Sequence, residues 1–159
     1  MNKIFFLLLL FNSTTSIAQL ENQRMTFLIV IDNEYPSSDI ISSKFIVEDS
    51  TNNIKDQINF EYNVGKLIMS QIDYEKLFKL KPGYKLFIKL VRRNLDLNTD
   101  YTYNAQIPKQ FINDIYIIVR IYNRYDKENQ VKYYFENEQT YISQIIIPGY
   151  RTILTTLKK

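Results

Sequence analysis

Apolar and polar residues alternate along much of the chain. Apolar side chains occupy every second position, and most intervening positions are polar, over residues 58–63, 84–91, 101–107 and 131–136. Successive side chains of a strand point to opposite faces, so this alternation predicts strands that bury one face and leave the other wetter. Such strands are typical of antiparallel sheets that pack on one side.

Two further segments, residues 25–31 and 115–121, are apolar on both faces and are therefore predicted to be central strands. Additional strands are expected over residues 43–48, 66–70, 141–147 and 151–157. About nine or ten short strands separated by polar turns indicate a single-domain, all-β, antiparallel β-sandwich, immunoglobulin-like or prealbumin-like in architecture. A closed barrel is the alternative. The predicted core takes residues from both the alternating strands and the wholly apolar ones. These residues are Phe60, Leu86, Ile88, Ile117, Val119 and Ile121.

One segment has helical rather than alternating spacing. Residues 72–80 place their apolar side chains on one side of a short helix, and Pro82 and Gly83 then end it. A single additional turn is expected at residues 108–113. The predicted fold is therefore a β-sandwich with one short helix.

The N-terminus has the pattern of a secretory signal peptide over residues 1–18. The positive charge of Lys3 precedes an apolar run at residues 4–11, and small residues follow before an expected cleavage site at Gln19. That run is too short to span about 30 Å of hydrocarbon, which argues against an uncleaved membrane anchor. We therefore expect an exported protein, periplasmic or extracellular, whose mature domain is residues 19–159 and contains no transmembrane segment.

Composition excludes several chemistries. The 159 residues include no Cys and no His, so disulfides, thiolate or imidazole metal sites and a Ser-His-Asp triad are impossible. An export product without cysteine favours a bacterial envelope over a eukaryotic secretory route. The net charge of +3 is too small to predict a nucleic-acid partner.

No catalytic residue and no cofactor are predicted. The chain has no Gly-rich phosphate loop, and no serine is followed three positions later by the lysine of a Ser–Lys dyad. A pair of carboxylates about 5–10 Å apart across a cleft can hydrolyse a glycoside. A carboxylate-dependent hydrolase is therefore the enzymatic alternative to a binding protein.

Six cations and no carboxylate lie within residues 79–93. Lys85, Lys89 and Arg93 fall on the outward face of one predicted strand, with Phe87 between two of them. Such a stripe suits the acidic patch of another envelope protein or an acidic glycan. The alternative is a solvated strand face whose lysines discourage aggregation.

Tyrosines concentrate late in the chain, where nine of thirteen follow residue 100. Tyr116, Tyr122 and Tyr134 fall on the less apolar faces of their predicted strands. Exposed tyrosine rings add contact area at low entropy cost, so these three are candidates for binding a partner or a sugar. Packing between strands is the alternative role.

Asp96, Asn98 and Asp100 have the spacing with which a calcium-binding loop begins. The position that requires Gly is Tyr101, and the position that requires Glu is Ile107, so the segment is not an EF-hand. We expect a polar hairpin turn, with a partial calcium site as the alternative.

These observations favour an exported, non-catalytic protein-interaction or assembly module of the bacterial envelope. A carbohydrate- or calcium-binding accessory domain is the alternative. The interaction module predicts an exposed apolar or aromatic patch and no deep pocket. The sugar binder predicts tyrosine rings along a groove, beside Asn or Gln.

Overall fold

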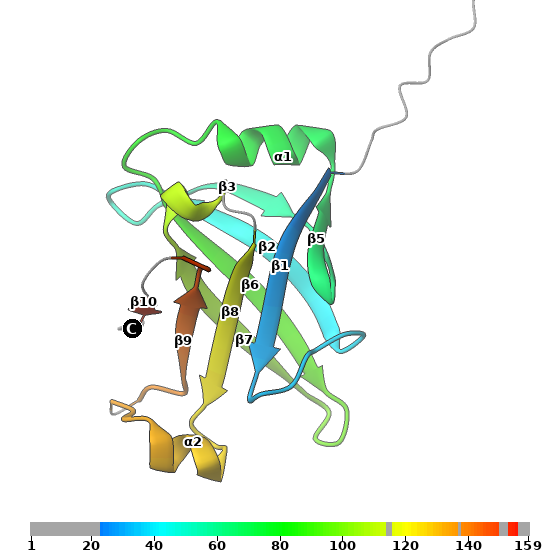
Figure 1. Ribbon diagram of the computed structural model, residues 1–159, viewed down its shortest axis with the longest axis vertical. Helices are drawn as coiled ribbons and strands as arrows, with labels where there is room; N and C mark the ends of the chain where they lie inside the picture. The colour runs from blue at the N-terminus through cyan, green and yellow to red at the C-terminus, as the bar shows by residue number, and fades with distance from the viewer. Residues whose placement is uncertain (1–22, 114–115, 137, 150–152, 156–159) are drawn as a thin grey trace, which may run out of the picture.

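Two β-sheets pack face to face in the computed structural model (Figure 1), which describes residues 23–113, 116–136, 138–149 and 153–155. The predicted β-sandwich is therefore confirmed, since the strands of the described residues form two sheets rather than a closed barrel. The expected signal peptide at residues 1–18 lies outside the described residues.

The larger sheet has six strands in the order β10-β9-β8-β1-β5-β4. In that order the strands are Ile153–Thr155, Tyr141–Ile146, Ile117–Asn123, Gln23–Ile31, Gly65–Met69 and Glu61–Asn63. The segments that are apolar on both faces form β1 and β8, which pair in parallel at the centre of this sheet. The other pairings of the sheet are antiparallel.

The smaller sheet has four antiparallel strands in the order β3-β2-β6-β7. These strands are Ile54–Asn59, Ile40–Glu48, Lys85–Asn94 and Thr99–Ile107. Figure 1 shows this sheet behind β1, β8 and β9, with α1 at one end of the sandwich and α2 at the other.

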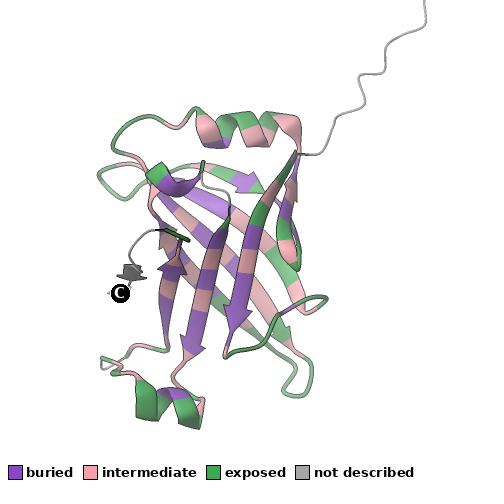
Figure 2. Cartoon of the chain, viewed as in Figure 1, coloured by how far each residue is buried: buried purple, intermediate pink, exposed green. Residues whose placement is uncertain are grey.

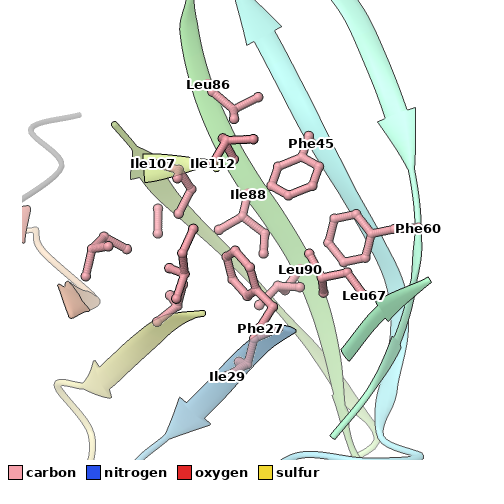
Figure 3. Packing of buried hydrophobic residues seen from close by; sticks show 14 of the residues in the cluster. Phe27, Ile29, Phe45, Phe60, Leu67, Leu86, Ile88, Leu90, Ile107 and Ile112 are labelled. Carbon is pink, nitrogen blue, oxygen red and sulfur yellow. The ribbon is translucent and has the colours of Figure 1, made fainter. Parts of the chain in front are cut away.

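The core fills the space between the two sheets (Figure 3), where Phe27 of β1 meets Phe45 of β2 edge to face at 6.3 Å between ring centroids. Buried and less buried residues alternate along most strands (Figure 2), as the period of two predicts. Burial confirms every predicted core residue: Phe60, Leu86, Ile88, Ile117, Val119 and Ile121.

The predicted helix is α1, Gln71–Phe78, which begins where the Ser70 hydroxyl accepts a hydrogen bond from the Asp73 N–H. This is the usual way to satisfy a free amide at a helix start. Leu77 anchors the helix on the core. The expected turn at 108–113 contains the 3₁₀ helix η1, Lys109–Phe111.

The strand predicted over residues 131–136 is wrong. A second short helix, α2 (Lys127–Lys132), occupies the start of that segment, and no strand follows it there. The Asp126 side chain caps α2 by accepting from the Asn129 N–H at 2.9 Å, and the Asn129 amide donates to Asp32 at 2.7 Å. Capping and a distant tertiary contact therefore override the local alternation.

The strand predicted over residues 58–63 is divided between the two sheets. Its first part ends β3 and its second part is β4, so the chain crosses from one layer to the other at Phe60. The Phe60 N–H donates to the Ser43 carbonyl, and the Ser43 hydroxyl donates to the Phe60 carbonyl at 2.6 Å. These bonds hold the crossing point against β2.

Candidate functional site

Three residue pairs face outward across β2 and β6. The inward positions of β6 are Leu86, Ile88 and Leu90, so Lys85, Phe87 and Lys89 lie on the outer face, as the sequence predicts. The register places each of them opposite a residue of β2 in the pairs Lys44–Lys89, Ile46–Phe87 and Glu48–Lys85. Directly opposite side chains on neighbouring strands have Cβ atoms about 4.5–5.5 Å apart and therefore interact.

A groove of about 740 Å³ runs over the Lys44–Lys89 and Ile46–Phe87 pairs and reaches Glu48, and we call it the outer groove. Its floor is apolar, because Ile46 is 7% exposed and Phe87 is half-buried. It is lined by Lys44, Ile46, Glu48, Asn52, Ile54, Gln57, Phe87, Lys89, Thr102, Asn104, Glu138, Gln139, Thr140 and Tyr141. The two lysines therefore stand beside an apolar floor, several amides and hydroxyls, and the carboxylates of Glu48 and Glu138.

The lysines of the outer face make no ion pair within 4.0 Å among the described residues, although Glu48 lies opposite Lys85 in the register. Lys44 Nζ donates to Gln57 Oε1 at 2.8 Å, and Lys85 Nζ donates to Asn52 Oδ1 at 2.7 Å. No carboxylate of the described chain lies within 4.0 Å of their Nζ atoms or that of Lys89. Like charges directly opposite in a sheet are destabilising, so repulsion between Lys44 and Lys89 lowers the local stability of the sheet. A bound anionic group would remove this repulsion.

Tyr141 fixes the wall of the groove beside β7. The Asn104 N–H donates to the Tyr141 hydroxyl at 2.7 Å, and that hydroxyl donates to the Asn104 carbonyl at 3.2 Å. Burial raises the pKa of Tyr141, which keeps its proton available for the second bond. The Tyr141 ring also packs edge to face on Tyr103, with centroids 5.2 Å apart. The wall is therefore held by two hydrogen bonds and one ring contact.

Two residues of the predicted basic stripe, Lys85 and Arg93, do not line this groove. Arg93 lies near the far end of β6, where its Nε and Nη2 atoms donate to Asp100 at 2.9 and 3.1 Å. The two residues are directly opposite on β6 and β7. The stripe therefore divides into lysines without acidic partners and an arginine that is paired.

The three predicted tyrosines do not gather at the groove. Tyr134 is 87% exposed and Tyr116 is 37% exposed, but Tyr122 is only 4% exposed. The expectation that Tyr122 is exposed is wrong, because the Tyr133 ring covers it at a centroid distance of 4.3 Å. The Tyr122 hydroxyl donates to Gln144 Oε1 at 3.0 Å, which gives it the packing role of the alternative prediction.

A second cavity, of about 630 Å³, lies at the end of the sandwich where the β1–β2 loop, the β6–β7 hairpin and the segment after β8 meet. Asp32 accepts from the Asn123 N–H at 2.7 Å and from the Asn129 amide at 2.7 Å. Arg92 pairs with Asp39 and, at 2.8 Å, with Glu34. The polar groups of this end cavity therefore bind mainly one another.

The Asp96–Asp100 segment is the predicted hairpin turn. Asn94 accepts from the Leu97 N–H at 3.0 Å, and Asn98 adopts a left-handed φ of 46° that asparagine tolerates. Asp100 bonds Arg93 and not a shared site with Asp96. Within the described ranges, no three acidic side chains are grouped so that they could hold a metal ion.

Comparison with known proteins adds no assignment, since no family model, no curated protein and no solved structure matches the chain. No helix within the described part of the chain is long and apolar enough to cross a membrane.

The sequence predicts two residues of the groove, Phe87 and Lys89. It can do so because alternation within one strand assigns each residue to a face. Lys44, Ile46 and Tyr141 were missed, because they come from segments about 40 or more positions away along the chain. The strand predicted over residues 43–48 was the available signal, but register between strands is set by the whole fold.

Proposed function

We propose that the protein is an exported, non-catalytic binding module of the bacterial envelope. In this proposal the outer groove binds an extended acidic segment of another envelope protein. The observation that carries the proposal is the Lys44–Lys89 pair, two facing cations without a carboxylate partner in the described chain, beside the Ile46–Phe87 floor. The absence of His and Cys from the sequence supports a role without catalysis.

The spacing of the groove suits an extended chain. The lysine pair and the apolar pair are two residues apart along each strand, which corresponds to about 6.6 Å. An extended ligand repeats its side-chain direction at the same interval. An acidic residue followed two positions later by an apolar residue therefore presents a carboxylate to the lysines and an apolar side chain to the floor.

A fluorescein-labelled peptide of alternating Glu and Val residues tests this function by fluorescence anisotropy. We expect Lys89→Glu to raise its dissociation constant at least about tenfold, equivalent to about 1.4 kcal/mol. Lys66→Glu is the matched control, because Lys66 is an exposed lysine of β5 in the other sheet, and it should leave binding unchanged. Added salt should weaken binding, because the contact is partly exposed.

Two results would contradict the proposal. Equal binding of a peptide with Lys in place of Glu would show that the groove does not select acidic ligands. Unchanged affinity in Lys89→Glu would show that the peptide binds elsewhere. Competition by an acidic oligosaccharide, with no affinity for the peptide, would instead assign the groove to a glycan.

Export belongs to the same proposal. The pattern of residues 1–18 supports it, and we propose that the mature chain begins at Gln19 and acts in the periplasm or outside the cell.

A further inference from the structure

The tip of the β6–β7 hairpin exposes two large apolar side chains that the proposed function does not use. Leu95 is 79% exposed and Leu97 is 64% exposed, and the exposed Asp96 lies between them. No cation within the described residues lies within ion-pair distance of Asp96. Neighbouring exposed apolar residues around one charge are typical of a contact surface.

We propose that this Leu95-Asp96-Leu97 tip binds the outer groove of a second copy of the same chain. The carboxylate of Asp96 is complementary to the Lys44–Lys89 pair, and the two leucines are complementary to the adjacent apolar floor. The inference rests on the proposed function, because it takes the outer groove as the binding site and names its occupant.

The tip cannot reach the groove of its own molecule. Leu95 follows Lys89 by six positions on the same hairpin, so the two lie about 20 Å apart along the sheet. The hairpin is held by the register of β6 and β7 and by the bidentate Arg93–Asp100 pair. Contact between tip and groove is therefore intermolecular.

Tip and groove are different surfaces, so the contact is head to tail. Each copy offers one tip and one groove, and such heterologous contacts build rings or open chains of molecules. A hairpin tip in a groove buries a small area, below about 1,200 Å², which is characteristic of weak association. Self-association should therefore develop between micromolar and millimolar concentration and decrease with added salt.

Sedimentation velocity of the mature chain, residues 19–159, over a concentration series tests the inference. We expect the wild type to form dimers and larger species, and Asp96→Lys to remain a monomer at the same concentrations. Glu61→Lys is the matched control, because Glu61 is an exposed acid on β4 of the other sheet. Asp96 lies in an exposed turn, so its substitution leaves the core intact.

A charge exchange makes the test specific to the pair of surfaces. The variant Lys44→Glu with Lys89→Glu should also be monomeric alone. An equimolar mixture with Asp96→Lys should associate again, because each tip then meets a groove of opposite charge. Loss of association in both variants with recovery in the mixture supports the inference.

A wild type that stays monomeric to millimolar concentration would overturn the inference, and so would an Asp96→Lys variant that associates normally. If the monomeric protein still binds the Glu–Val peptide through Lys89, the inference fails while the proposed function stands. If neither the peptide nor a second copy binds the outer groove, both fail.

Discussion

At the scale of single residues, Asp49 shows how one carboxylate organises the turn between β2 and β3. Its Oδ1 atom accepts from the Thr51 hydroxyl at 2.7 Å and from the Asn53 N–H at 3.0 Å, and Oδ2 pairs with Lys55 at 2.9 Å. The Thr51 hydroxyl first, and then Lys55 and Asn53, hold the pKa of Asp49 well below its usual range. The folded turn therefore requires the ionised form.

This requirement predicts an acid-sensitive contribution to stability. The pKa of Asp49 is lower in the folded than in the unfolded chain, so the unfolded chain binds the proton more readily. The contribution is complete above about pH 4, the unfolded value, and is lost as pH falls through the folded value. Asp49→Asn should melt at a lower temperature at pH 7 and depend less on pH below 4.

Thermal melting by circular dichroism between pH 7 and pH 2 measures this difference. Asp96→Asn is the control, because it removes an exposed turn carboxylate that makes no ion pair in the described chain, and it should follow the wild-type curve. Parallel curves of melting temperature against pH for the wild type and Asp49→Asn would contradict the stabilising role assigned to ionised Asp49.

At the scale of elements, the sequence predicts best those strands in which apolar and polar residues alternate regularly. Strands β6 and β7 have clean alternation and lie where the sequence places them. Residues 131–136 also alternate, but α2 includes the first two of them, and it is held by the bond between Asn129 and Asp32, 97 positions apart. Such a contact leaves no pattern among neighbouring residues of the sequence. The same is true of the strand register that brings Lys44 opposite Lys89.

The packing of β6 against the other sheet gives an element-scale prediction. Ile88 is fully buried in the centre of the core, so Ile88→Ala should lower the free energy of unfolding by about 2–5 kcal/mol. Ile72→Ala, at a position 60% exposed on α1, is the matched control and should change it by less than about 0.5 kcal/mol. Urea denaturation measures both; similar losses would contradict the assigned core.

At the scale of the whole molecule, the two sheets have different outer faces. On the six-stranded sheet, Val30, Tyr122 and Ile142 are buried even though their neighbours in sequence point to the core. The four-stranded sheet carries the floor of the groove, Tyr141 of β9 supplies one wall, and the leucine tip lies beside the end cavity. Both proposed binding surfaces therefore lie outside the core of the sandwich.

Strand β1 connects the export proposal to this architecture. It lies between β5 and β8, and its described residues begin at Gln23, downstream of the expected cleavage at Gln19. Removal of residues 1–18 therefore leaves every pairing of β1 in place. Removal through Phe27 deletes all five β1 positions that pair with β5.

We therefore predict that protein recovered from the cell envelope begins at Gln19 or within a residue or two of it, as N-terminal sequencing would show. A recombinant chain that starts at Gln19 should unfold cooperatively in urea. A chain that starts at Leu28 should lose several kcal/mol or fail to fold, because β5 and β4 lose their connection to the centre of the six-stranded sheet. Retention of Met1 in the envelope protein would refute the export proposal. A stable chain starting at Leu28 would refute only the structural role of β1, because the two results depend on different segments.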